Sequence, residues 1–368
     1  MMKKKLLSLI LALTLILSLA ACGSTPANNT PANDGTTTTA PADTDNTASE
    51  VEELSLMWGI TPPPSASDTI SAKRMAENLK EKSGGKIVAE VYPGATLGGE
   101  DVMIESLLSG TIDMANVSPN VVATVVPEMN ALCLPFLYKN HAAAIDSITD
   151  PEYTAKINEV LEPYGLHYLG VNYIVPRCIT CNSELHTPAD CKGEVIRVMA
   201  GPIYSDIYAS WGLNTSVIAW GECYTAMQQH TVDGVDGGNE SSIDMAFYEV
   251  AKYNIQTNHT YHAQMCLMSL EKWNSLNQAT RDLITEVAAE NTTWTGNYAL
   301  ENAEVETHDV ENEPYNMINI YLTDAEREAW IDASQVVYDK YKPIIGEDFY
   351  NWITDFAAAK NAKHAENA

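Results

Sequence analysis

Two arginines, Arg177 and Arg197, are the residues of this chain whose type and setting best suit the binding of an anion. Arg197 lies within the apolar run 195–199, which predicts a short buried strand. A buried guanidinium needs an anionic partner, because an unpaired charge in an apolar interior is very costly. Its planar fork of N–H donors fits a carboxylate through two parallel hydrogen bonds. The partner of Arg197 is therefore either an internal Asp or Glu or the carboxylate of a ligand.

A series of short motifs accompanies the two arginines. Near them stand TPADCKG at 187–193, ECYTAMQ at 222–228 and DG at 233–234. Upstream stand EKSGGK at 81–86, YP at 92–93, LGGE at 97–100, GTIDM at 110–114 and LPF at 134–136. In this order, over about residues 51–355, they resemble the solute-binding proteins of tripartite ATP-independent periplasmic (TRAP) transporters.

The resemblance implies an α/β, two-lobed periplasmic-binding-protein-like fold. Each lobe would be a mostly parallel sheet flanked by helices, with one long helix spanning both lobes. Arg197 would hold the ligand carboxylate, Arg177 would supply a second cation at the rim, and Trp220 would take the place of a phenylalanine that lines the floor of the site. Trp58 and Tyr173 are further candidates for the cleft.

Two positions bear on the identity of the ligand. Gly237 falls where the family commonly has an asparagine that binds ligand oxygens, and Asn239 or Asp236 are its possible substitutes. Ser118 falls where some sialic-acid-binding members have a glutamate, which argues against that sugar acid. Gly237 and Trp220 together suggest apolar area in place of polar contacts, so we expect a keto, hydroxy or aromatic acid.

The elements that position these residues alternate between strand and helix. In the first lobe we expect strands at 54–59, 86–92 and 111–117, and helices at 68–82, capped by Asp68, and 101–109. Repeated β-α-β units predict an open parallel sheet with helices on both faces. Ligands bind at the carboxyl ends of such strands, which places 58–61, 97–100 and 116–120 at the site. The prolines at 62–64 force an extended loop there.

The second lobe should begin near Tyr173. We expect its strands at 177–182, 195–199, 215–218 and 232–236, and its helices at 203–211, 222–229 and 242–252. A strand at 264–269 returns to the first lobe, a long helix covers 277–301, and Thr323 opens a capping box. Lobe I would comprise 51–174 plus about 263–302, lobe II 175–262 plus about 303–356, and 357–368 should be a frayed tail.

The N-terminus is typical of an exported lipoprotein. Residues 1–21, three lysines followed by an apolar run, read as a signal peptide, and Leu19-Ala20-Ala21-Cys22 resembles a lipobox whose cysteine is lipidated. Residues 22–50 would then be a lipidated Cys22 followed by a flexible tether poor in large apolar residues. We therefore expect an extracytoplasmic protein, in the periplasm or on the cell surface, held at the membrane only by its lipid.

Charge and motif content exclude several classes of function. The formal net charge of −28 argues against nucleic acid or an anionic membrane surface as a partner. No catalytic, dinucleotide or phosphate-loop motif is present. Cys178, Cys181 and Cys191 lack the second half of a zinc site. We therefore expect no metal or cofactor and mostly buried free thiols, while a Cys181–Cys191 disulfide stays open.

These observations predict a solute-binding lipoprotein, not an enzyme. It would capture a small organic acid and deliver it to the separate membrane permease subunits of a TRAP transporter. Two alternatives stay open: a secreted hydrolase or lyase acting on an acidic substrate, and a ligand-sensing lobe that feeds a signalling receptor.

Overall fold

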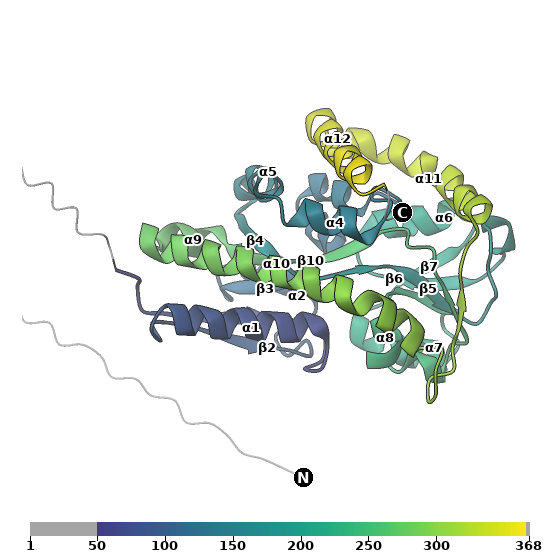
Figure 1. The fold of residues 1–368 in the computed structure, drawn as a ribbon, viewed down its shortest axis with the longest axis horizontal. Helices are drawn as coiled ribbons and strands as arrows, with labels where there is room; N and C mark the ends of the chain where they lie inside the picture. The colour runs from purple at the N-terminus through teal and green to yellow at the C-terminus, as the bar shows by residue number, and fades with distance from the viewer. Residues whose placement is uncertain (1–49, 366–368) are drawn as a thin grey trace, which may run out of the picture. The chain divides into compact units, whose positions relative to one another are not determined.

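Two β-sheets with helices on their faces form the framework of the described residues, which in this computed structural model are 50–365, without the side chains of 303–306 (Figure 1). The five-stranded sheet has the spatial order β2 (Ile87–Tyr92), β1 (Leu54–Gly59), β3 (Met114–Val117), β10 (Tyr261–Ser269) and β4 (Leu166–Pro176). The six-stranded sheet has the order β11 (Ile318–Ile320), β9 (Tyr253–Ile255), β5 (Cys178–Cys181), β8 (Gly234–Gly237), β6 (Val195–Val198) and β7 (Asn214–Val217).

Each sheet combines parallel and antiparallel pairs. In the five-stranded sheet β1 is parallel to β2 and β3, whereas β10 runs antiparallel to β3 and β4. In the six-stranded sheet β6 is parallel to β7 and β8, whereas β5 runs antiparallel to β8 and β9. The antiparallel members are the strands where the chain passes between sheets: β4 leads into β5 through the single residue Arg177, and β10 brings the chain back.

The helices pack on the sheets as the alternation of strand and helix predicts. Beside the five-stranded sheet lie α1 (Ser67–Lys82), α2 (Glu100–Leu108), α3 (Pro119–Val122), α4 (His141–Ile148), α5 (Pro151–Leu161) and α9 (Leu270–Ser275). Beside the six-stranded sheet lie α6 (Pro202–Ser210), α7 (Cys223–Gln228) and α8 (Asn239–Asp244). We call these two groups, each with its sheet, the first and second lobe; their boundaries as given above stay predictions.

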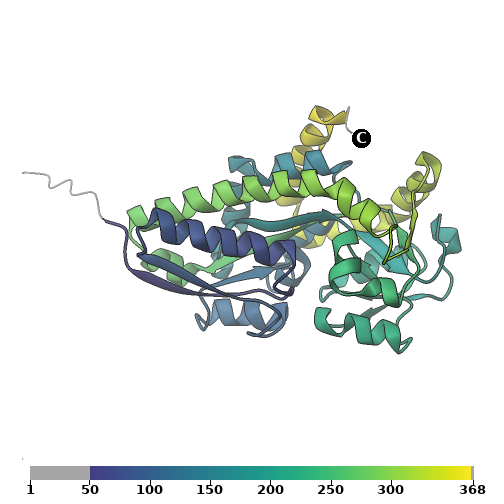
Figure 2. The same cartoon turned by 60° about the horizontal axis from the view of Figure 1, so that its bottom comes forward.

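The long helix expected from the family resemblance is confirmed. It is α10 (Gln278–Asp309), and it contacts α1, α4 and β4 of the first lobe and α8 of the second (Figure 2). Asn277 caps it by accepting a hydrogen bond from the backbone N–H of Thr280 at 2.9 Å. One continuous helix therefore packs against both lobes and ties them together on one side.

Two local predictions in the site region are wrong. Asp68 does not cap α1: Ala66 is the N-cap residue, and Asp68 is a buried residue of the first turn. The free N–H of Ser67 is instead bound by the carboxylate of Glu240, which comes from the second lobe. The helix expected at 242–252 is interrupted because Ala246 adopts a left-handed backbone with φ of 55°, so α8 ends at Asp244.

The C-terminal segment is ordered further than the sequence suggests. The capping box at Thr323 is confirmed and opens α11 (Asp324–Ile345). The frayed tail at 357–368 is wrong for the part that the structure describes, because α12 (Glu347–Lys363) continues through it. Its buried residues Phe349, Ile353 and Ala357 face the first lobe, where α12 packs on α4. Composition alone missed this stripe of three residues in helical spacing.

Ion pairs between α4 and the C-terminal end of α12 join this helix to the first lobe. Asp146 of α4 lies 2.7 Å from Lys363 Nζ, 2.9 Å from His364 Nε2 and 3.3 Å from Lys360 Nζ. Partial burial alone would raise the pKa of Asp146, but the hydrogen bonds from Lys363 and His364 and the charge of Lys360 outweigh it. The pKa of Asp146 is thereby lowered from the ordinary 3.8 to about 2.

We predict that Asp146→Asn destabilises the protein at neutral pH and that the difference vanishes in acid. A carboxylate with a depressed folded-state pKa contributes stability above its unfolded pKa and loses it as the pH falls through the folded pKa. The gap between wild type and variant should therefore close as the pH drops from 3.8 towards about 2. Urea unfolding across this range measures it, with Asp332→Asn at an exposed position of α11 as control. A gap that does not change with pH would contradict the prediction.

Candidate functional site

A cavity of about 560 Å³ lies between the two lobes. The first lobe lines it with residues that follow β1, lie at the start of α2 and follow β3: Thr61, Pro62, Pro63, Gly99, Glu100 and Ser118. The second lobe lines it with residues that follow β6 and β7 and with α8 and its C-terminal end, among them Met199, Ile218, Trp220, Glu240, Asp244 and Met245. Its volume falls within the usual range for small-molecule sites, about 300–1,000 Å³. Of the segments 58–61, 97–100 and 116–120 that we expected at the site, Thr61, Gly99, Glu100 and Ser118 line the cavity, and the other residues of these segments are not among its lining.

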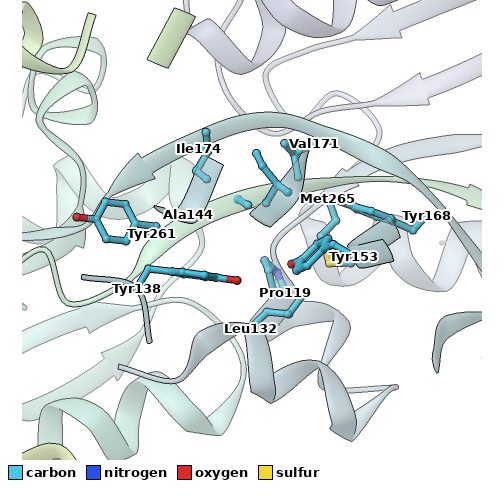
Figure 3. Close-up of a pocket in the computed structure, with 12 residues that line it drawn as sticks. Pro119, Leu132, Tyr138, Ala144, Tyr153, Tyr168, Val171, Ile174, Tyr261 and Met265 are labelled. Carbon is cyan, nitrogen blue, oxygen red and sulfur yellow. The ribbon is translucent and has the colours of Figure 1, made fainter. Parts of the chain in front are cut away.

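A second, smaller void lies inside the first lobe and is too small to be the ligand site. It is lined by apolar and tyrosine side chains from β4, β10, α4 and α5 and from the chain around Leu132, and its volume is about 20 Å³ (Figure 3). This is room for about one water molecule. The cavity between the lobes is therefore the candidate ligand site.

Arg197 is a buried cation on the wall of this cavity. It is the third residue of β6, which pairs in parallel with β7 and β8, and its side chain is only 2% exposed. Its Nε donates to the carbonyl of Ile218 at 2.8 Å, and its guanidinium lies 5.2 Å from the centre of the Trp220 ring. Burial lowers the pKa of Arg197 from its ordinary 12.5.

The guanidinium of Arg197 lacks an anionic partner within the described residues. Nη1 is buried without any hydrogen bond, and no described Asp or Glu forms an ion pair with this side chain. Of the two partners that the sequence left open, the internal carboxylate is absent from the described part of the chain. A buried, unneutralised cation that lines a cavity is suited to bind the carboxylate of a ligand.

Arg177 has the opposite situation. It is 4% exposed, and its Nε forms an ion pair with Asp236 while Nη2 donates to the carbonyl of Asp236 at 2.6 Å. Burial opposes the charge of both side chains, but their mutual attraction outweighs it, so the pKa of Arg177 is raised and that of Asp236 is lowered. His259 also faces Asp236 at 3.7 Å.

The prediction that Arg177 is a cation at the exposed rim is therefore wrong. Its side chain borders the cavity, but it lies where the chain passes from β4 to β5, a position that the packing of both lobes buries. A charge buried there needs a permanent partner, and Asp236 of β8 supplies it. The internal Arg–Asp bridge that we considered for a buried arginine applies to Arg177.

Three more of the predicted site residues line the cavity: Trp220, Ser118 and Tyr173. Trp220 lies edge-on to Phe247, with 5.7 Å between the ring centres. This contact orients the Trp220 ring, whose face lies against the guanidinium of Arg197. The backbone N–H of Ser118 donates to Glu100 at 2.7 Å. The ring of Tyr173 lies edge-on to the ring of His262, with 6.5 Å between the ring centres. His262 also lines the cavity.

Four predicted site residues are not among those that line the cavity: Trp58, Asp236, Gly237 and Asn239. Trp58 is fully buried and donates to Asn116 at 3.0 Å. Gly237 pairs with Cys178 inside the sheet, and Asn239 forms hydrogen bonds with Gln256 behind it. Asp236 and Gly237 belong to β8 and Asn239 opens α8, and none of the three lines the cavity. The expectation of a keto, hydroxy or aromatic acid therefore loses the support of Gly237.

Sequence reasoning missed an acidic part of the wall. Six carboxylates border the cavity: Asp101 and Glu222 are exposed, and the less exposed four are Asp68, Glu100, Glu240 and Asp244. Gln264 donates to Glu100 at 2.9 Å and is itself a lining residue. These four carboxylates and Gln264 come from α1, α2, α8 and β10. No local spacing could have grouped them; only Glu100 lay in a segment that we placed at the site.

None of the cysteines in the described part of the chain lines the cavity. All six described cysteines are free and buried, as predicted, and the Cys181–Cys191 disulfide that was left open does not form. Burial raises the pKa of Cys181 and of Cys191 to about 12 each. Within residues 50–365, no cluster of His, Cys, Asp and Glu is arranged to hold a metal ion. Cys22 and the predicted signal peptide and tether lie outside the described residues.

None of the helices in the described part of the chain combines the length and apolar character that crossing a membrane requires.

Comparison with known proteins agrees with this architecture. The chain is 25% identical to the C4-dicarboxylate-binding protein DctB of Bacillus subtilis over 283 residues, 76% of this chain and 79% of the relative. It is 28% identical to the 2,3-diketo-L-gulonate-binding periplasmic protein YiaO of Escherichia coli over 287 residues, 77% of this chain and 86% of the relative.

A solved structure shows the same fold. The sugar acid binding protein DctPAm from Advenella mimigardefordensis, in complex with galactonate, superposes with a TM-score of 0.78 at 24% identity. The alignment covers 84% of this chain and 100% of that protein. The family model for DctP, bacterial extracellular solute-binding protein, family 7, matches residues 59–343. This match covers most of the chain, and the chain belongs to that family.

Proposed function

We propose that this protein captures a small carboxylic acid outside the cytoplasm and delivers it, chemically unchanged, to a TRAP-type membrane transporter. The observation that carries the proposal is the guanidinium of Arg197, buried on the cavity wall with Nη1 unpaired. A ligand carboxylate that accepts two hydrogen bonds from this group would satisfy it. Trp220, which already lies against the guanidinium, would pack on the carbon skeleton of the ligand.

Binding would be coupled to closure of the two lobes. Glu240 of the second lobe holds the N-terminus of α1 in the first through Ser67 N at 2.9 Å and Ser67 Oγ at 2.8 Å. Opening the cavity would break this contact, and a ligand held from both lobes would favour the closed state. Closure would also remove water from the pair of Arg197 and the carboxylate and so strengthen it.

The roles outside the cavity are proposed on the family and the sequence. The family consists of extracellular solute-binding proteins, and two relatives are named for binding carboxylic acids. Separate permease subunits would accept the ligand, and lipidated Cys22 would keep the protein at the membrane. A protein with this role returns its ligand unchanged, so chromatography of a bound and released acid distinguishes it from an enzyme.

We predict that Arg197→Ala abolishes high-affinity binding. Removing one partner of a buried, hydrogen-bonded charge pair costs about 3–5 kcal/mol, which is about two to three or more decades in Kd. Arg197→Lys should recover little, because an ammonium group cannot reproduce the planar fork. A thermal-shift screen of organic acids identifies the ligand, and calorimetric titration of the variants measures the loss.

Arg281→Ala, on α10 away from the cavity, is the matched control and should bind as the wild type does. Circular dichroism establishes that each variant is folded. If folded Arg197→Ala binds its acid with unchanged affinity, the proposed role of this residue is refuted.

For Arg177 we predict a loss of stability. Arg177→Ala leaves the carboxylate of Asp236 buried without its partner, and this costs about 3–5 kcal/mol of unfolding free energy. Asp236→Asn in the same chain should restore part of the loss, because it removes the stranded charge. Urea unfolding of the two single variants and the double variant gives the coupling energy. Independent, additive effects would show that the pair is not a unit.

A further inference from the structure

The carboxylates that line the cavity, from both lobes, restrict the charge of its ligand. We propose that the ligand is a zwitterion: a small monocarboxylate that also carries an ammonium group, which the carboxylates of Asp68 and Asp244 hold while Arg197 holds the carboxylate. The inference rests on the proposed function, since it assigns a chemical class to the ligand of the same cavity.

Asp68 is the best-defined acceptor for a positive group. It is 1% exposed, lines the cavity and receives a hydrogen bond from Asn116 on Oδ1. Its other oxygen, Oδ2, is buried with no hydrogen-bond partner in the described structure. Asn116 is itself held through its Oδ1 by Trp58 and Asn172, so the network keeps Asp68 oriented. A buried acceptor in such a fixed position calls for a donor, and a ligand in the cavity can bring one.

Asp244 supplies a second carboxylate from the opposite lobe. It stands at the C-terminal end of α8, lines the cavity, and has no hydrogen bond or ion pair with any described residue. Burial, and then the charge of Glu240, raise its pKa to about 6. Burial raises the pKa of Asp68 to about 8, with Glu100 and Glu240 adding to the rise. The charged form of both carboxyl groups is therefore disfavoured, and an ammonium group beside them would stabilise it.

Of the other lining carboxylates, Asp101 and Glu222 are exposed to solvent, whereas Glu100 and Glu240 already have partners. Glu100 accepts from the backbone of Ser118 and from Gln264, and Glu240 accepts from Ser67. Arg177 is neutralised by Asp236, so Arg197 is the one arginine of the lining without a carboxylate partner in the described structure. A dicarboxylate would bring two negative charges to a single available guanidinium, and its second charge would face an acidic wall. Like charges repel more strongly in a partly dry cavity than in bulk water.

A matched set of ligands tests the inference. γ-Aminobutyrate, γ-hydroxybutyrate and succinate share one carbon chain and differ only in the group opposite the carboxylate. The purified protein is titrated with these three, and with the shorter and longer members of each series, by thermal shift and calorimetry. We expect the amino acids to bind at least about tenfold more tightly than the hydroxy acids of the same length, and the dicarboxylates to bind least.

Charge-removing variants assign the effect to the named residues. Asp68→Asn and Asp244→Asn keep the shape of the side chain and should each weaken amino-acid binding about ten- to hundredfold. The same changes should leave dicarboxylate binding equal or stronger, because they remove repulsion. Asp332→Asn, on the exposed face of α11, is the control and should change neither. Asp244 is only partly buried, so its variant stays informative if Asp68→Asn fails to fold.

The outcomes separate this inference from the proposed function. Suppose that hydroxy acids or dicarboxylates bind more tightly than amino acids and that Arg197→Ala abolishes this binding. This result would overturn the proposal of a zwitterionic ligand, but it would agree with the proposed function as a carboxylate receptor. Amino acids that bind equally well to both Asp variants, or no binding by any amino acid of the series, would also overturn it. Binding that is indifferent to Arg197→Ala would refute the proposed function itself.

Discussion

The buried guanidinium of Arg197 is the constraint on which the cavity depends. Its side chain is almost fully removed from water, yet the described structure gives this cation only the carbonyl of Ile218 and the face of Trp220. Such a charge is far from satisfied, and it becomes satisfied when an anion enters the space beside it. In the proposed function this unpaired charge would favour a carboxylate, because neutral molecules of the same size would leave it unpaired.

The two arginines show how position, rather than residue type, determines the role of a charge. Arg177 occupies the single residue between β4 and β5, where both lobes bury it, and the permanent ion pair with Asp236 makes it part of the framework. Its backbone N–H is also bound to the carbonyl of Thr260, just before β10 returns to the first lobe, so the two chain crossings are joined there. This hydrogen bond and the packing of α10 against α1, α4, β4 and α8 therefore join the two lobes.

The carboxylates of the wall combine structural and ligand-directed roles. Glu240 caps α1 across the cavity, and the N-terminus of a helix favours such a negative charge. Glu100 orders the backbone after β3 and the side chain of Gln264. Asp68 and Asp244 line the same cavity as Arg197 and have no positive partners in the described structure. Burial and the neighbouring carboxylates raise the pKa of both acids, so their surroundings disfavour the charged form.

The sequence by itself determined the alternation of strands and helices, the residues at the carboxyl ends of β1 and β3, and the placement of Arg197 and Trp220 at the site, because apolar periodicity and ordered motifs are local signals. It did not determine which charges meet. The pairing of Arg177 with Asp236, the cap that Glu240 provides to α1, and the acidic wall all join segments distant in the chain. The packing of α12 on the first lobe was likewise decided by contacts that its alanine-rich composition does not reveal. Electrostatic partners depend on distances of a few ångströms in space, and only the folded chain sets those distances.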